Sequence, residues 1–251
     1  MSNRYQGGVI SATPVTGSGP YETSTAKGVW TIDQAMQLKK QGLWPTAGNV
    51  APPSVIGEAY GGGFYAGQIG VSSVATHYLI VGPISSAENS SIQWKNATTT
   101  TTGADSLIDG PQNTADMVAD GSSTVYPAAH FCNDLVIGGY SDWYMAAKNE
   151  LEICYYNLKP TTGSNVTSTG ANPNAVPARA SNYTTGTPAQ TSAAAFVTST
   201  GAQAFGSANY WCSTESTSTS AYSKYFPNGG QYFTRYKTNS YRVRAIRRIA
   251  V

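Results

Sequence analysis

The clearest periodicity of apolar positions lies in residues 138–158, GGYSDWYMAAKNELEICYYNL. From Lys148 onward, apolar side chains recur at the i, i+3, i+4, i+7 spacing of one helix face. These positions are Leu151, Cys154, Tyr155 and Leu158. Pro160 disfavours helical geometry in the residue before it, so the pattern predicts a helix that begins near Lys148 and ends before Pro160. Glu150 lies where a capping-box glutamate reaches back to the start of the helix.

Shorter signals of both strands and helices flank this helix. β-prone runs occupy residues 63–69, 77–83 and 91–96. Residues 113–121 predict a brief helical turn, and the apolar spacing after Pro127 predicts a helix whose apolar face continues to Leu135.

The C-terminal part of the chain returns to strand signals. Two β-prone runs flank Asn228-Gly229, a strong hairpin signal. The final run, YRVRAIRRIA, alternates apolar and basic residues through Ala245 and loses the alternation at Ile246. A bulge, or a strand buried on both faces, would produce that loss. Together these segments predict an α+β fold.

The composition divides the chain into two parts. Residues 1–55 are expected to form an extended Gly/Ser/Thr/Pro-rich arm with a short helix that begins at Thr31. Residues 45–54, PTAGNVAPPS, have the composition of a linker, and residues 56–251 form the second part. Within it, residues 160–207 are a low-complexity insertion, and a loop of that length is usually functional or disordered.

The charge content is low. Charged residues make up 11% of the chain, against about 25% in an ordinary soluble domain, and the formal net charge is +2. This balance gives no reason to expect a nucleic-acid partner or membrane insertion. No run approaches the ~20 apolar residues of a membrane span.

The residue types that carry most enzyme chemistry lack a recognisable context. Neither His77 nor His130 accompanies a candidate nucleophile, and the chain has no CxxC spacing. We therefore expect no enzyme activity, no catalytic residues, no metal and no cofactor. Of the three cysteines, Cys132 and Cys154 lie on adjacent predicted helices and could pair, but buried thiols are the preferred interpretation.

Two separated blocks resemble a known family. GGYSDWYMAAKNEL, and NYWCSTES followed by RVRAIRRI, are similar to the paired blocks of a domain with a C-type-lectin-like fold, common in bacteriophage and bacterial surface proteins. Their order and spacing agree over roughly residues 60–250. The calcium-site signatures of lectins (Glu-Pro-Asn, Gln-Pro-Asp and Trp-Asn-Asp) do not occur in the sequence. We assign Trp143, Leu151 and Trp211, which lie in these blocks, to the structural core.

The leader of the chain carries a second resemblance. GGVIS followed by GVWTIDQAMQLKKQGLWP is similar to a segment that precedes unrelated domains in marine phage structural proteins. The resemblance implies that the arm attaches the protein to other virion proteins.

The segment 215–241 is the candidate binding surface. It combines tyrosines with Ser, Thr and Asn, the composition of adaptable binding loops, and tyrosine rings also suit sugars. In the resembled family this region carries the ligand face. Strand alternation predicts that Phe226 and Phe233 are buried. The predicted ligand-binding set is Tyr225, Asn228, Gln231, Tyr232 and Tyr236.

These observations predict a bacteriophage virion protein. We expect a tail fibre or receptor-binding adhesin, a homotrimer that recognises a host-surface glycan or protein. The alternatives are that the tyrosines simply pack a β-sheet, and that the protein is a capsid decoration or other structural virion protein. The start MSNRYQGGVI lacks the cationic and apolar regions of a secretory signal, so we expect assembly in the host cytoplasm and a place on the particle surface.

Deletion of residues 1–45 tests the separation between arm and domain. Because the composition changes at residues 45–54, the remaining fragment is expected to stay soluble and to unfold cooperatively, but to be absent from particles. Immunoblotting of purified particles measures incorporation. Normal incorporation of the fragment would show that the arm is not the anchor.

Overall fold

The computed structural model describes residues 52–251, of which Pro53–Val251 form one compact unit. The arm and short helix predicted within residues 1–55 lie almost wholly outside this range. The described elements, in chain order, are β1 (Ala59–Tyr60), β2 (Gly63–Val71), β3 (Val74–Val81), α2 (Ile84–Ala87), β4 (Glu88–Gln93), α3 (Gly110–Asp120), α4 (Pro127–Asn133), β5 (Tyr144–Met145), α5 (Lys148–Leu158), the 3-10 turn η1 (Ala194–Phe196), β6 (Asn209–Glu215), β7 (Ser220–Tyr225), β8 (Gly230–Tyr236) and β9 (Ser240–Ala250).

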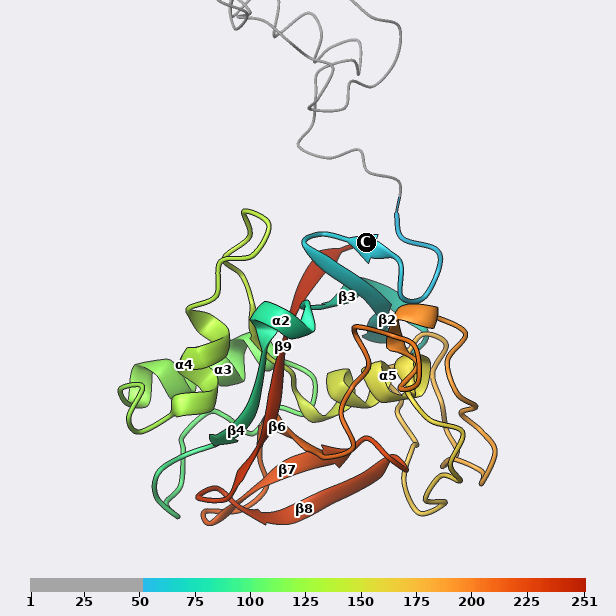
Figure 1. Ribbon diagram of the computed structural model, residues 1–251. Coiled ribbons are helices and arrows are strands. Elements are labelled where there is room, and N and C mark those ends of the chain that lie inside the picture. Colours follow the sequence, from blue (N-terminus) through green and yellow to red (C-terminus); the bar gives the residue numbers. More distant parts are fainter. Residues whose placement is uncertain (1–51) are drawn as a thin grey trace, which may run out of the picture. The chain divides into compact units, whose positions relative to one another are not determined.

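Strand β9 is central to the sheet (Figure 1). The described strands follow the order β1-β2-β3-β9-β6-β7-β8, and β4 and β5 also pair with β9. The β6–β9 pair is parallel, whereas β9 runs antiparallel to β3, β4 and β5. Val243 to Arg247 are all buried, so the lost alternation at Ile246 reflects a strand buried on both faces. Helices together with a mixed sheet confirm the α+β class.

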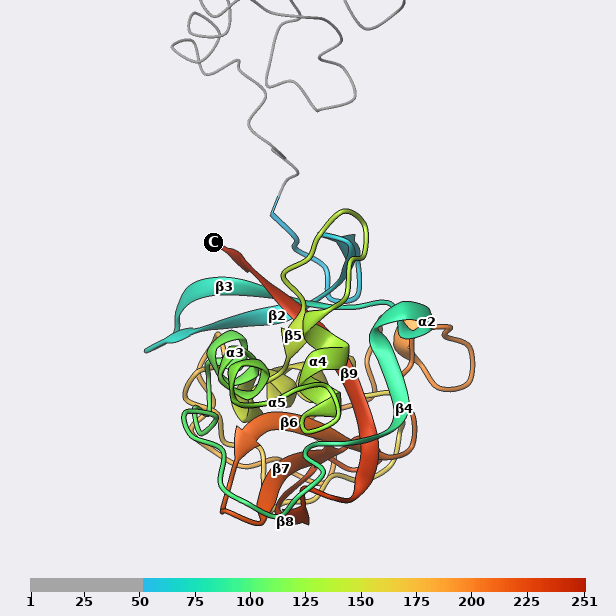
Figure 2. The same cartoon turned by 90° about the vertical axis from the view of Figure 1, so that its left-hand side faces the viewer.

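Apolar side chains fill both faces of the sheet. Helix α5 covers one face, in a cluster that includes Leu151 and Phe226. Helices α3 and α4, seen from their own side in Figure 2, cover the other face, in a cluster that includes Trp143 and Trp211. The three residues assigned to the core, Trp143, Leu151 and Trp211, are each at most 2% exposed.

Helix α5 begins at Lys148 and ends at Leu158, as the sequence predicts. Glu150 Oε2 accepts a hydrogen bond from Ala147 N at 2.7 Å. This contact is half of a capping box, because alanine offers no side-chain acceptor in return.

Helices α3 and α4 differ from their predicted lengths. Helix α3 is a full helix of 11 residues instead of a brief turn. Its start is fixed by Pro111 in the first turn and by the side chain of Asp109, which accepts a hydrogen bond from Gln112 N. Helix α4 ends at Asn133, two residues before Leu135.

The insertion of residues 160–207 is part of the packed domain, although η1 is its one regular element. In Figure 1 it runs as a yellow-to-orange coil beside α5. Tyr155 OH of α5 donates to Asn165 Oδ1 at 2.7 Å, and Tyr183 is 5% exposed. Side chains of the insertion therefore hold it against the helix, and the disordered alternative is wrong.

The three cysteines are buried and unpaired. Cys132 lies in the cluster beneath α3 and α4, whereas Cys154 lies in the cluster beneath α5. Burial raises the pKa of both thiols. The preference for buried thiols is confirmed.

Replacing Trp211 with alanine is expected to lower the free energy of unfolding by about 3–5 kcal/mol, because the lost side chain leaves a cavity. The change also removes the hydrogen bond from the indole to Ile92 O at 3.0 Å. Phe233→Ala, at a side chain that is 58% exposed, serves as the control. Chemical denaturation of the full chain measures both variants, and equal losses would contradict a core role for Trp211.

Candidate functional site

The predicted hairpin is present as β7 and β8, but its turn is longer than Asn228-Gly229. Tyr225 pairs with Gly230, so all the residues between them form the turn. Gly229 has a φ of 72°, and a Cβ there would lie 2.3 Å from the Tyr155 ring. Both facts require glycine at this position.

A β-bulge changes which hairpin side chains are exposed. The pairing steps from Ala221↔Arg235 to Ser223↔Tyr232, so β8 contributes one residue more than β7 between these pairs. The alternation therefore cannot be carried through β8. Phe233, which the sequence predicts to be buried, is 58% exposed.

The predicted ligand-binding residues do not share one face. Tyr225 and Tyr232 lie on the face that carries Trp211, both half-buried, with their rings in edge contact at 6.5 Å between centroids. The guanidinium of Arg235 lies 4.2 Å from the centroid of the Tyr232 ring. Tyr236, near the end of the hairpin, is 59% exposed.

Asn228 and Gln231 have other positions. Asn228 Oδ1 accepts a hydrogen bond from Gly230 N at 3.1 Å, so this side chain stabilises the turn. Gln231 pairs across the hairpin with Lys224 and lies on the inner face, where it lines a cavity. The structure therefore brings Tyr225 and Tyr232 together and separates them from Gln231.

The cavity at the inner face of the hairpin has a volume of about 320 Å³, and we call it the hairpin pocket. In Figure 1, α5 lies above β7 and β8, and the insertion runs beside them. All three segments line the pocket. Its principal side chains are Lys148 and Glu152 of α5, Thr169 and Asn182 of the insertion, and Tyr222, Lys224, Gln231 and Phe233 of the hairpin.

Lys224 is a fully buried ammonium with few partners. Its Nζ donates to Tyr183 OH at 3.0 Å and lies 5.0 Å and 4.8 Å from the ring centroids of Tyr155 and Tyr183. No carboxylate of the described residues lies within 4.0 Å of it. Burial lowers the pKa of Lys224 to about 8.

Glu152, the acidic residue that lines the hairpin pocket, is engaged elsewhere. It pairs with Arg179 and accepts hydrogen bonds from Asn172 Nδ2 and Tyr183 OH, each at 2.5 Å. Burial, followed by the charge of Glu152, raises the pKa of Tyr183. One tyrosine hydroxyl thus links Lys224 to Glu152 without a direct ion pair.

Gln231 adds an unpaired acceptor to the pocket. Its Nε2 donates to Ser223 O at 3.0 Å, whereas its Oε1 is buried without a partner. Lys148, which is partly exposed, adds a second ammonium. Because the carboxylate of Glu152 is already neutralised by Arg179, the hairpin pocket is positively charged.

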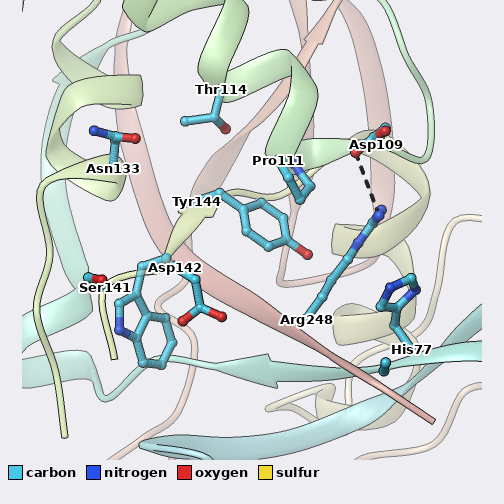
Figure 3. Close-up of a pocket in the computed structure, with 11 residues that line it drawn as sticks. His77, Asp109, Pro111, Thr114, Asn133, Ser141, Asp142, Tyr144 and Arg248 are labelled. Carbon is cyan, nitrogen blue, oxygen red and sulfur yellow. Dashed lines mark ion pairs between the residues drawn. The ribbon is translucent and has the colours of Figure 1, made fainter. Parts of the chain in front are cut away.

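A larger cavity of about 480 Å³, the helix pocket, lies beside α3, α4 and the ends of β3 and β9 (Figure 3). Arg248 Nε donates to Glu150 Oε1 at 2.6 Å, and Arg248 Nη1 lies 3.6 Å from Asp109. Asp142 accepts two hydrogen bonds from Arg247, at 2.7 Å and 2.8 Å. Each of these charges has a partner within the protein, which distinguishes the helix pocket from the hairpin pocket.

His77 also lines the helix pocket, and its Nδ1 lies 3.0 Å from Thr76 Oγ1. Burial, followed by the nearby charge of Arg248, lowers the pKa of the imidazole, so His77 is neutral at pH 7. Among residues 52–251, no group of three or more His, Cys, Asp or Glu side chains is placed to hold a metal ion. In the same range no helix is long and apolar enough to cross a membrane.

No protein-family model matches the sequence, and no curated protein matches it significantly.

Sequence reasoning missed Lys224, Lys148 and Glu152 as site residues. A signal for Lys224 exists, because it shares strand parity with the buried Phe226 and a lysine is unusual at an inward position. Lys148 and Glu152 are separated by four residues, which places them on one side of α5. The insertion of residues 160–207 covers that side of α5. Its sequence has no helical or strand periodicity, so its position in the fold could not be predicted.

The buried ammonium of Lys224 is expected to make the fold less stable below pH 8 than above it. Its pKa falls from 10.5 to about 8 on folding. The unfolded chain therefore binds more protons between these values, and stability rises with pH across this window. The free energy of unfolding of the wild type, minus that of Lys224→Met, should rise by up to about 3 kcal/mol from pH 7 to pH 10. Denaturation at a series of pH values measures this difference, and a constant difference would contradict the lowered pKa.

Proposed function

We propose that this chain is a bacteriophage virion protein that recognises a host-surface glycan or protein through the hairpin side of a C-type-lectin-like domain. The paired sequence blocks support the proposal, and so does their place in an α+β fold. Trp143 of the first block and Trp211 of the second are both buried against the sheet.

The observation that carries the proposal is the aromatic and polar surface of the hairpin, which adjoins a cavity. Phe233 and Tyr236 are 58% and 59% exposed. Phe233 borders the hairpin pocket together with Tyr222 and Thr169. Rigid aromatic side chains supply contact area at low entropic cost, and small polar side chains supply hydrogen bonds. A surface of this composition beside a cavity suits ligand binding better than packing within the fold.

In this proposal the protein is a tail fibre or receptor-binding adhesin on the particle surface. It is assembled in the host cytoplasm as a homotrimer. Its N-terminal arm joins it to other virion proteins.

One observation favours a second candidate, a capsid decoration or other structural virion protein. Tyr225 and Tyr232 are half-buried and contact each other, and such cross-strand pairs stabilise a sheet without any ligand. The two candidates differ in location, because adhesins lie at tail tips and decorations lie on the capsid.

The double variant Tyr225→Ala, Tyr232→Ala tests host recognition. Well-packed interfacial tyrosines contribute on the order of 1–2 kcal/mol each, so loss of both should weaken binding by about 30-fold or more. The measurement is binding of the labelled full chain to cells of the host strain, together with adsorption of particles that carry the variant. Thermal unfolding checks that the fold is intact.

Tyr140→Ala is the matched control, because Tyr140 is a 40% exposed tyrosine outside the hairpin. It is expected to bind cells as the wild type does. Unimpaired adsorption by the double variant would exclude the tyrosine pair from the receptor site. The site would then lie elsewhere, with the insertion of residues 160–207 as the next candidate, or the decoration candidate would be favoured.

A further inference from the structure

Lys224 differs from Lys159 and Lys237, which are also at most 1% exposed, in what satisfies its charge. Lys237 forms an ion pair with Glu215 at 2.9 Å. Lys159 has no such pair, but it donates to the backbone carbonyls of Gly163 at 2.5 Å and Pro188 at 3.1 Å. Lys224 has a single tyrosine hydroxyl as its hydrogen-bond acceptor. Burying a charge with so few partners costs desolvation free energy. An anion bound near Lys224 would provide the negative charge that the protein itself does not place there.

The hairpin pocket has room for that anion, since Lys224 lines a cavity of about 320 Å³. Lys148 lines the same cavity from α5 and adds a second positive charge. Gln231 Oε1, buried and without a partner, requires a hydrogen-bond donor. A ligand that suits all three groups carries a negative group and hydroxyl donors together.

We propose that the hairpin pocket binds an acidic sugar, a sugar ring that bears a carboxylate or phosphate group. Lys148, which is partly exposed, binds the anionic group directly, whereas the fully buried ammonium of Lys224 attracts it from behind the pocket lining. Gln231 Oε1 accepts a hydrogen bond from a sugar hydroxyl. Phe233 at the rim packs on the C–H face of the ring, and Thr169 and Asn182 bind further hydroxyls. This assignment rests on the proposed function, since it names a ligand class for the same hairpin, at the inner face opposite Tyr225 and Tyr232.

The charged groups around Lys224 give the binding a characteristic pH dependence. Lys148 and Glu152 reach it from α5 and Arg179 from the insertion, with the thiol of Cys212 on β6. Without ligand, burial holds the pKa of Lys224 near 8. Because an anion binds the protonated form, affinity should be high at pH 7 and fall as the pH rises through 8.

Calorimetric titration of the full chain with glucuronic acid, glucose 6-phosphate and glucose tests the assignment. At pH 7 and low salt, at least one of the two acidic sugars should bind about tenfold more tightly than glucose, and added salt should reduce the difference. The two acidic sugars show which anionic group the site prefers.

Variants separate the pocket from general charge effects. Lys148→Gln, at a partly exposed position, and Lys224→Met should each weaken binding of the acidic sugar by about tenfold or more. Arg235→Gln removes the same charge from the opposite face of the same hairpin and should leave sugar affinity unchanged. Equal affinity for glucose and both acidic sugars, or acidic-sugar affinity unchanged in both lysine variants, would overturn the assignment.

Cell binding distinguishes this inference from the proposed function. If the tyrosine double variant loses adsorption while no acidic sugar binds, host recognition stands and the ligand class is wrong. If an acidic sugar binds through Lys148 and Lys224 but saturating sugar and both lysine variants leave adsorption unchanged, the ligand class stands. Host recognition through this pocket is then wrong.

Discussion

The arrangement of this domain depends on the buried carboxylate of Glu150. Its side chain has no exposed surface and accepts hydrogen bonds from Ala147 N at 2.7 Å, Gly110 N at 3.2 Å, Tyr144 OH at 2.6 Å and Arg248 Nε at 2.6 Å. The donors come from the start of α5, the start of α3, β5 and β9. Burial raises the pKa of Glu150, and Arg248 is the strongest influence that opposes this rise. Loss of any donor would leave a buried charge short of a partner, so one carboxylate holds four elements in a fixed relation.

This constraint also positions the hairpin pocket. Glu152 follows Glu150 by two residues on α5, which turns it to another side of the helix, where it meets Arg179 and Tyr183 of the insertion. Lys148 lies one turn earlier on that second side. Helix α5 therefore carries the hydrogen-bonded carboxylate of Glu150 on one side and lines the positively charged hairpin pocket on the other. A site whose charges sit on a helix and a strand keeps its geometry better than one made of loops.

The features that the sequence predicts correctly have local causes. Helix α5 follows from apolar spacing and Pro160. The local break in alternation in β9 left two alternatives, a bulge or burial on both faces, and the structure shows the second. The exposure of Phe233 was predicted wrongly because the bulge depends on the pairing of β7 with β8, which leaves no mark in β8 alone. The candidate site also combines a local feature with one that depends on tertiary contacts. The tyrosine-rich hairpin could be predicted from composition. The absence of an ion pair at Lys224 could not be predicted, because it depends on Arg179 and Tyr183 of the insertion, which bind the carboxylate of Glu152.

The insertion lines one wall of the hairpin pocket with small, uncharged residues, whereas α5 and the hairpin supply its charged residues. Thr169 Oγ1 donates to Gly229 O at 2.9 Å, and Asn182 Oδ1 accepts from Ala171 N at 3.2 Å, so short polar contacts anchor this wall. Few of its pocket-lining side chains reach the core, whereas Lys224 and Glu152 are both buried. In the proposed site, substitutions at the exposed wall positions Ser168 and Ala171 would alter the surface that meets the sugar at little cost to stability, because exposed side chains contribute little to the core. The charged residues of the pocket lie on a helix and a strand, whereas its wall consists of small polar residues in a loop. Loop substitutions can therefore change ligand specificity without changing the fold.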